Sequence, residues 1–291
     1  MFEIVRKEVL AENIVRMDIL APRVAVSAQP GQFVIVRVGE MGERIPLTIS
    51  DYDAASGRVT IVTQAIGVST NKICALEEGE SLTDLAGPLG RPSDFIYMPA
   101  EELKSRRFLF IAGGVGTAPL YPQVKWLHGR GVEADVIIGA KTKEQLILTD
   151  EMRSVAANLY ISTDDGSEGF KGLVTGLMEE LLLNGGSHYD EAVTIGPMIM
   201  MKFVALTTKK YNIKTTASLN TLMVDGTGMC GACRVTVGGK TRFTCVDGPE
   251  FDAHKIDFDE AMRRNSIYKT QEERAMSLSG HKCRIGVTNG K

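Results

Sequence analysis

Short stretches of alternating apolar and polar residues fill the chain up to about residue 95. The clearest are NIVRMDIL, QFVIVRV, RVTIVTQ and SLTDLAG, and turn-forming Gly, Pro, Asn and Asp separate them. A period of two residues places alternate side chains on opposite faces of a β-strand, and the frequent turns favour antiparallel neighbours. The pattern predicts a small antiparallel β-barrel over residues 1–98.

From Arg107 the pattern changes to buried apolar strands followed by helical segments. RFLFIAGG precedes TAPLYPQVKWLHGRG, ADVIIGA precedes KTKEQLIL, and AVTIGP precedes MIMMKFVAL, while NLYISTDD supplies a further strand. Strands that alternate with helices indicate a parallel sheet with right-handed crossovers. We therefore predict an α/β domain of the Rossmann type over residues 99–219, with ELKSRR as a linker near its start.

The composition shifts again after the strand-like KTTASLN. The Gly- and Cys-rich segment 225–249 has too few large apolar residues to form a core unaided. We predict a small subdomain over residues 220–255 that needs another stabilising element. Residues 257–279 contain helix formers and mixed charge, so the region 256–291 is interpreted as a surface helix and tail, or an arm that packs on a partner.

Composition excludes several classes of function. The 291-residue chain is 44% hydrophobic with a formal net charge of -3, which lacks the basic character of a nucleic-acid binder. The N-terminus mixes charge into every apolar stretch, and no run approaches the roughly 18 residues that span a bilayer. Five unevenly placed cysteines do not make a disulfide framework. We expect a soluble, cytoplasmic protein without nucleic-acid or membrane partners.

Three of the cysteines form the most specific motif. Cys230 and Cys233 lie two residues apart, Cys245 follows, and Asp225 precedes the pair by four residues. The plant-type 2Fe-2S pattern is C-x4-C-x2-C with a later fourth cysteine, so the segment matches it with aspartate in the first position. Structural zinc is the main alternative, although no histidine lies inside the segment. Asp225 is either a ligand or a turn residue, with Cys283 as another candidate for the fourth ligand.

A glycine-rich turn follows the first predicted parallel strand. In FLFIAGGVGTAPLYP the glycines permit close approach of a diphosphate, and the helix start supplies unpaired amides, although a tight structural turn would look the same. The ends of two later strands, around 164–172 and 196–202, are expected at the same edge. Met200 and Met201, taken singly, are more typical of core residues.

The barrel region carries two further motifs, RIPLTIS from Arg44 to Ser50 and AIGVSTNKI around Gly67. Singly they fit a surface cation and a helix cap. Together they resemble the flavin motifs of the ferredoxin-NADP reductase superfamily, and GGVGTAPLYP, TDDGS, GP-x-x-M and the cysteine segment follow in the family's order. The chain most resembles small subunits of NADH-dependent ferredoxin:NADP+ oxidoreductases, also described as sulfide dehydrogenase subunits, and electron-transfer subunits of type B dihydroorotate dehydrogenases. The latter normally have cysteine where Asp225 stands.

The resemblance implies particular site residues. FAD would be held by Arg44, Pro46, Leu47, Thr48, Ile49, Ser50, Thr63, Gly67, Val68, Ser69 and Thr70. The nicotinamide nucleotide would lie against Gly113, Gly114, Val115, Gly116, Thr117, Asp165, Gly196, Pro197 and Met200. The metal ligands would be Asp225, Cys230, Cys233 and Cys245. Many superfamily members have a cysteine where Ile195 stands here, and no catalytic acid or base is implied.

The implied function is electron transfer between NAD(H), with NADP(H) as the alternative nucleotide, FAD and a 2Fe-2S cluster. The implied partner is a larger flavin and iron–sulfur subunit, and the heterodimer would couple NADH, NADPH and ferredoxin by electron bifurcation. Three alternatives stay open. The chain is a subunit of a dihydroorotate dehydrogenase, a non-enzymatic subunit of the same fold, or a reductase whose cysteine segment binds structural zinc.

Overall fold

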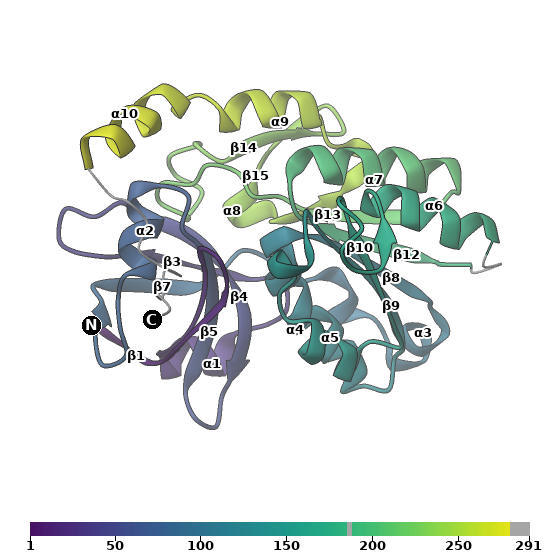
Figure 1. Cartoon of the computed structure of the whole chain (residues 1–291), viewed down its shortest axis with the longest axis horizontal. Helices are drawn as coiled ribbons and strands as arrows, with labels where there is room; N and C mark the ends of the chain where they lie inside the picture. The colour runs from purple at the N-terminus through teal and green to yellow at the C-terminus, as the bar shows by residue number, and fades with distance from the viewer. Residues whose placement is uncertain (185–187, 280–291) are drawn as a thin grey trace.

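The computed structural model describes residues 1–184 and 188–279 and contains two seven-stranded sheets (Figure 1). The first sheet is antiparallel, with the strand order β6-β1-β2-β5-β4-β3-β7, and it curls into a nearly closed barrel. Its strands are β1 (Phe2–Ala11), β2 (Ile14–Leu20), β3 (Phe33–Arg37), β4 (Ile45–Asp53), β5 (Arg58–Gln64), β6 (Ser81–Leu82) and β7 (Asp84–Leu89). The predicted barrel is confirmed.

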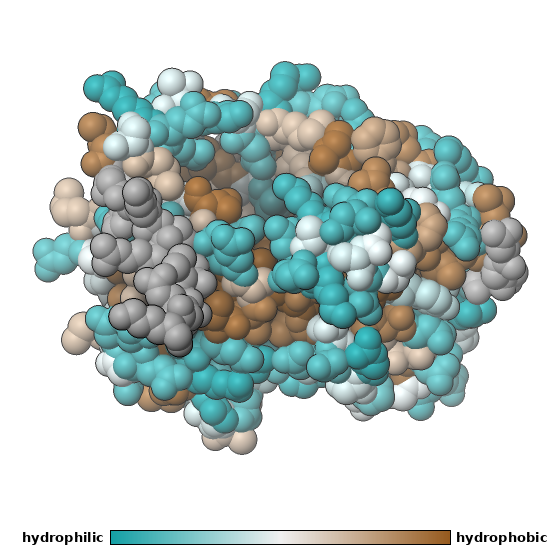
Figure 2. All heavy atoms as spheres, in the orientation of Figure 1, coloured by the Kyte–Doolittle hydropathy of each residue, from teal (hydrophilic) through white to brown (hydrophobic). Residues whose placement is uncertain are grey.

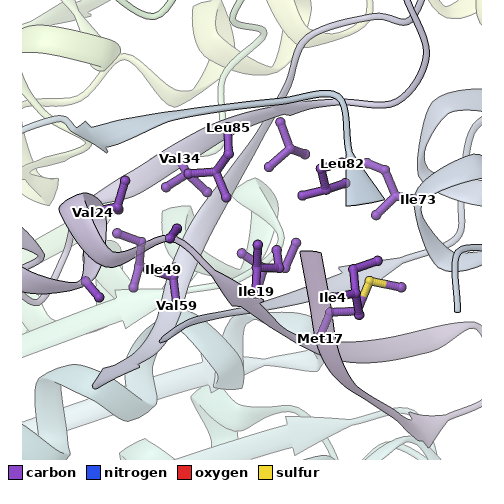
Figure 3. Close-up of a cluster of buried hydrophobic side chains, with 14 of the residues drawn as sticks. Ile4, Met17, Ile19, Val24, Val34, Ile49, Val59, Ile73, Leu82 and Leu85 are labelled. Atoms are coloured by element: carbon purple, nitrogen blue, oxygen red, sulfur yellow. The ribbon is translucent and has the colours of Figure 1, made fainter. Parts of the chain in front are cut away.

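The barrel core follows the alternating pattern of the sequence. Met17 and Ile19 on β2 face inward together with Ile4 on β1 and Val59 on β5, and each is at most 1% exposed (Figure 3). Two helices, α1 (Pro22–Ser27) and α2 (Val68–Cys74), contribute further residues to this core. Asp18, between Met17 and Ile19, lies on the other face of β2, where it is buried and its carboxylate accepts from the Thr60 hydroxyl at 2.7 Å.

The second sheet has the order β11-β10-β9-β8-β12-β13-β16, and every neighbouring pair except β13·β16 is parallel. Its strands are β8 (Phe108–Gly113), β9 (Ala134–Ala140), β10 (Asn158–Thr163), β11 (Phe170–Lys171), β12 (Glu191–Ile195), β13 (Lys214–Ser218) and β16 (Glu250–Asp252). The helices of this part are α3 (Ala100–Ser105), α4 (Thr117–His128), α5 (Thr149–Val155), α6 (Val174–Asn184) and α7 (Met198–Lys210). The predicted parallel-sheet domain is confirmed.

The order of these strands places a crevice at the carboxyl ends of the parallel strands. The chain runs outward through β8, β9, β10 and β11 and then returns to pair β12 with the other side of β8. The strand order reverses between the adjacent strands β8 and β12, so the turns after these two strands meet where open α/β sheets bind ligands.

Two expectations about helices need correction. The KTKEQLIL segment forms only a single-turn 3-10 helix, η3 (Lys143–Gln145), and α5 begins at Thr149. Ile147 and Leu148 are buried against Ala11 and Ile14 of the barrel, so contact with the other sheet, and not one face of a helix, explains their apolar character. The ELKSRR linker lies largely in α3.

The cysteine-rich segment forms a small lobe beside both sheets (Figure 1). It contains a hairpin of β14 (Arg234–Val237) and β15 (Lys240–Phe243) and the short helix α8 (Thr244–Asp247), and β16 then adds an antiparallel edge to the parallel sheet. The predicted C-terminal helix is present as two helices, α9 (Phe258–Asn265) and α10 (Lys269–Ser279). The remaining single-turn helices are η1 (Asp94–Tyr97), η2 (Gly114–Gly116) and η4 (Ala253–Lys255). Cys283 lies outside the described residues.

Candidate functional site

A cavity of about 910 Å³ lies between the barrel and the crevice edge of the parallel sheet. Its volume is in the range of roughly 300–1,000 Å³ that is usual for ligand and cofactor sites. Figure 2 shows hydrophobic side chains in the hollow near the centre of the molecule, between the two sheet domains. The barrel contributes the β4 segment and parts of β2 and β5, while the parallel sheet contributes the turns that follow its strands.

The glycine-rich turn forms one wall of the cavity. Gly113, Gly114, Val115 and Gly116 all line it between β8 and α4. Gly114 has a φ of 55°, which favours glycine, and a side chain on Gly116 would collide with the carbonyl of Ile195. Thr117 is fully buried, and its hydroxyl donates to the carbonyl of Gly114 at 3.0 Å. The turn therefore presents backbone and the first amides of α4, which suits a diphosphate.

Other strand ends meet this turn. The same cavity is lined by the ends of three further strands: Gly139 to Lys141 at the end of β9, Ser162 and Asp164 at the end of β10, and Ile195 to Pro197 at the end of β12. Met200 lines it too, beside Gly113, whereas Met201 is fully buried. The three strand ends named from the sequence are therefore brought together.

Asp165 does not line the cavity, although its neighbour Asp164 does. Hydrogen bonds from the hydroxyl and amide of Ser167 engage the Asp165 carboxylate, at 2.6 and 2.9 Å, and lower its pKa. Asp165 thus shapes the turn, and Asp164 is the acidic residue of this turn that lines the cavity.

The predicted flavin residues divide into three groups. Pro46, Leu47 and Thr48 line the cavity, while Ile49, Ser50 and Thr63 are buried at most 3% exposed and do not. Gly67, Val68, Ser69 and Thr70 lie outside the cavity at the start of α2, where the Thr70 hydroxyl accepts from the Gly67 amide at 2.9 Å. Arg44 precedes β4 and contacts the cysteine-rich segment instead.

Several cavity residues were missed by the motif search. Ser218, Leu219, Asn220 and Thr221 line the cavity directly after β13. The position of this segment at the end of a predicted parallel strand was a usable signal. Phe33, Met223 and Pro249 also line the cavity, but only the tertiary fold brings them there.

The fold brings the candidate metal ligands only partly together. Cys233 and Cys245 are both 2% exposed, and their sulfur atoms lie 3.3 Å apart. Cys230 is exposed. The two carboxylate oxygens of Asp225 accept from the backbone amides of Thr227 and Cys230 at 2.8 and 2.9 Å. Within residues 1–184 and 188–279, no three His, Cys, Asp or Glu side chains converge closely enough to hold a metal ion.

The loop nevertheless has the backbone and donors that an iron–sulfur cluster requires. Gly226, Gly228 and Gly231 have φ values of 78°, 86° and 67°, conformations that let a tight loop turn its amides inward. Burial and the hydrogen bond shared with Cys233 raise the pKa of the Cys245 thiol to about 12. Metal binding must displace such protons, because thiolate is the ligand form. The donor set of thiols and carboxylate, without histidine, fits a cluster better than zinc.

Two side chains connect the cavity wall to the cluster that contains the two buried cysteines. Phe33 and Met223 pack in one apolar cluster with Cys233 and Cys245, and both also line the cavity. A ligand against this wall and a metal group held by the cysteines would therefore be near neighbours.

Comparison with known proteins agrees with this arrangement. Residues 220–257 match the model of the iron–sulfur cluster binding domain of dihydroorotate dehydrogenase B. The chain is 42% identical to the dihydroorotate dehydrogenase B (NAD(+)) electron transfer subunit homolog of Thermotoga maritima, over 93% of each chain. It is 56% identical to an uncharacterized protein in the adh 3′ region of Clostridium beijerinckii, over 94% of this chain and 93% of that one.

A solved structure is similar over almost the whole chain. A chain of the NADH-dependent reduced ferredoxin-NADP oxidoreductase, studied for flavin-based electron bifurcation, superposes with a TM-score of 0.87 at 40% identity. The match covers 96% of this chain and 98% of that chain.

The barrel, the parallel sheet and the cavity between them have the ferredoxin-NADP reductase-like fold. The chain belongs to the family of dihydroorotate dehydrogenase B electron-transfer subunits and their homologues. The predicted family, fold class and general function, electron transfer with FAD, NAD(H) and a 2Fe-2S cluster, are confirmed. No helix in the described ranges has both the length and the apolar content of a membrane span.

Proposed function

We propose that this chain is the NADH-oxidising subunit of a ferredoxin:NADP+ oxidoreductase and delivers electrons to a larger flavin and iron–sulfur partner. The observation that carries the proposal is the wall of Phe33 and Met223, which lines the cavity and packs in the same apolar cluster as Cys233 and Cys245. Bound in these places, FAD converts the two-electron chemistry of a nicotinamide nucleotide into the one-electron chemistry of an iron–sulfur cluster.

The chain's own residues would bind and orient the flavin and the nicotinamide nucleotide. Pro46, Leu47 and Thr48 supply the barrel side of the flavin site. The glycine turn and the N-terminus of α4 receive the nucleotide diphosphate through backbone amides. Ile195 lines the cavity where many superfamily members have cysteine, so positioning replaces any contribution from a thiol.

The proposed domain assignment follows from these roles. Residues 1–98 would bind FAD, residues 99–219 would bind the nicotinamide nucleotide, and residues 220–255 would hold the cluster. The C-terminal part from residue 256 would pack on the partner, and Ile267 and Tyr268 between α9 and α10 supply exposed apolar surface for that contact, at 53% and 50% exposure.

A second candidate function is service to dihydroorotate oxidation, because the Thermotoga maritima and Fusobacterium nucleatum relatives are named for it. Asp225 favours the first function, because the dihydroorotate subunits that the chain resembles normally have cysteine at that position. The solved bifurcating enzyme is also similar over nearly the full length of both chains.

Anaerobic co-purification from the native source tests the proposal. We expect FAD, about two iron atoms and two acid-labile sulfides per chain, and a larger flavin and iron–sulfur subunit in the same complex. NADH should reduce the bound flavin, and the complex should link NADPH and ferredoxin. A dihydroorotate-oxidising partner would select the second function. Colourless protein would contradict both, and zinc without iron would select a zinc-stapled subunit.

A further inference from the structure

One buried hydroxyl in the cavity wall has no hydrogen-bond partner. Thr221 is 8% exposed, and its Oγ1 accepts and donates no bond within residues 1–184 and 188–279. Six buried side-chain atoms in this part of the chain lack a partner, and Thr221 is the residue among them that lines the cavity. Leaving a buried hydroxyl unpaired costs roughly 1–3 kcal/mol, so such a group in a ligand site points to a bond completed by the ligand.

The segment that carries Thr221 packs toward the barrel. Two residues further on, Met223 packs against Phe33, and Phe33 pairs across the barrel sheet with Thr48 of β4. Thr48 lines the cavity in the segment assigned to the flavin. Met223 and Phe33 thus connect the Thr221 segment to the barrel wall of the cavity, where the flavin is assigned.

The hydroxyl oxygen of Thr221 is buried, so the side chain must rotate to present its hydroxyl to a ligand in the cavity. Rotation about the Cα–Cβ bond exchanges the hydroxyl and methyl positions of threonine, and both belong to ordinary staggered rotamers. A hydroxyl donates one hydrogen bond and accepts others. A flavin ring offers carbonyl oxygens and ring nitrogens as acceptors and a ring N–H as a donor.

We propose that Thr221 hydrogen-bonds the flavin ring and ties the bound flavin to the cysteine-rich segment. The inference rests on the proposed function, because it requires FAD in the cavity. Thr221 is four residues before Asp225, and the intervening Met223 forms part of the wall to Cys233 and Cys245. The threonine is thus a flavin contact on the chain segment that leads directly into the candidate metal loop.

The test compares three variants of the full chain. Thr221→Val removes the hydroxyl and keeps the shape, and Thr221→Ser retains the hydroxyl. Thr194→Val is the matched control, because Thr194 is also buried with an unpaired hydroxyl but does not line the cavity. FAD is added to flavin-free protein, and quenching of flavin fluorescence gives the dissociation constant. Thermal unfolding is recorded with and without FAD.

Thr221→Val should raise the FAD dissociation constant about 3- to 10-fold, the effect of one lost hydrogen bond. Thr221→Ser should stay within about twofold of wild type, and Thr194→Val should bind FAD as wild type does. Without FAD, Thr221→Val should unfold at the wild-type temperature or above, since an unpaired polar group has been removed.

Three results would overturn the inference. One is unchanged FAD binding by Thr221→Val, and another is a lower unfolding temperature of that variant without FAD, which would reveal an internal partner for the hydroxyl. The third is weaker NADH binding with unchanged FAD binding, which would assign Thr221 to the nicotinamide nucleotide. Wild-type protein that binds no FAD would instead contradict the proposed function itself.

Discussion

The guanidinium of Arg44 donates from Nη2 to the backbone carbonyl of Asp225 at 3.2 Å, and from Nε to that of Val224 at the same distance. Arg44 immediately precedes β4, whose first residues line the cavity. One side chain therefore fastens the cavity-lining strand β4 to the loop that begins the candidate metal site. Two adjacent carbonyls suit the fixed fork of an arginine.

Replacing Arg44 should loosen this loop. In Arg44→Ala both hydrogen bonds disappear, each worth roughly 0.5–1.5 kcal/mol. We expect cluster loss to accelerate about 5- to 50-fold in a chelator challenge, followed by the decay of visible absorbance. The rate of cluster loss in Arg44→Lys should lie between those of wild type and Arg44→Ala, because an ammonium group cannot bond both carbonyls as the forked guanidinium does.

Arg23→Ala is the matched control for Arg44→Ala. Arg23 is an exposed arginine on α1, away from the cysteine-rich segment. Its cluster should decay at the wild-type rate. If Arg44→Ala decays no faster than this control, the clamp does not stabilise the loop.

Asp225 is either a metal ligand or only a turn residue, and two substitutions separate these roles. The carboxylate accepts the amides of Thr227 and Cys230. The Asp225→Asn variant keeps one acceptor oxygen, enough for one of the two amides, but loses the anionic ligand, whereas Asp225→Ala loses the ligand and both acceptors. We expect both variants to lose most of their iron and acid-labile sulfide. Wild-type iron content and spectrum in Asp225→Asn, with loss only in Asp225→Ala, would reduce Asp225 to a turn residue.

The two sheets could be predicted from sequence because strand periodicity is a local property. Met17 and Ile19 occupy the inward positions that alternation assigns. The KTKEQLIL prediction failed because Ile147 and Leu148 bury against Ala11 of the barrel. A short apolar run arises both in a buried helix and in a segment that packs against another domain. Only the fold distinguishes the two cases.

The candidate site shows the same limit. The glycine turn from Gly113 to Gly116 is contiguous, so its motif located it. Phe33, Thr221 and Pro249 meet across three parts of the chain, and no spacing rule connects them. Arg44 belongs to a recognisable motif, but its contact with Asp225 is visible only in three dimensions.

The tight glycine turn predicts a strong effect of one added methyl group. A Cβ at Gly116 would meet the Ile195 carbonyl and the Gly196 Cα, which are backbone atoms and cannot swing aside. Gly116→Ala should displace the turn, weaken NADH binding by at least about tenfold and destabilise the fold by roughly 1–3 kcal/mol. Isothermal titration with NADH and denaturant unfolding measure the two effects.

Gly129→Ala serves as the control at the other end of α4. Gly129 has φ of −62°, and an added Cβ would approach no atom closer than 3.5 Å. We expect unchanged NADH binding and equal or slightly higher stability, because alanine restricts the unfolded chain. Equal NADH affinity of Gly116→Ala and Gly129→Ala would show that the glycine turn does not bind the nucleotide.

Glu250 of β16 joins the two sheet domains through one carboxylate oxygen. Its Oε1 accepts from the Ser93 hydroxyl at 3.0 Å and from Gln123 Nε2 of α4 at 2.8 Å. Burial raises the pKa of Glu250 from 4.5 to about 7, with Asp94 and Glu191 adding to the rise and the two hydrogen bonds opposing it. The folded state therefore binds this proton more tightly than the unfolded state.

The sign of the pH dependence follows from that difference. Between pH 4.5 and about 7 the folded state holds more protons than the unfolded state, so the free energy of unfolding falls as the pH rises. The full loss is on the order of 3 kcal/mol. Glu250→Gln keeps an acceptor oxygen for Ser93 and Gln123 without the charge, so it should escape the loss.

Denaturant unfolding at pH 5 and pH 8 tests this expectation. Glu250→Gln should gain stability relative to wild type between the two pH values, whereas Glu273→Gln, at an exposed position on α10, should not. The difference between the variants is what isolates Glu250, because other groups titrate in both proteins. A parallel decline of wild type and Glu250→Gln from pH 5 to pH 8 would mean that the carboxylate finds enough water or charge compensation to ionise without penalty.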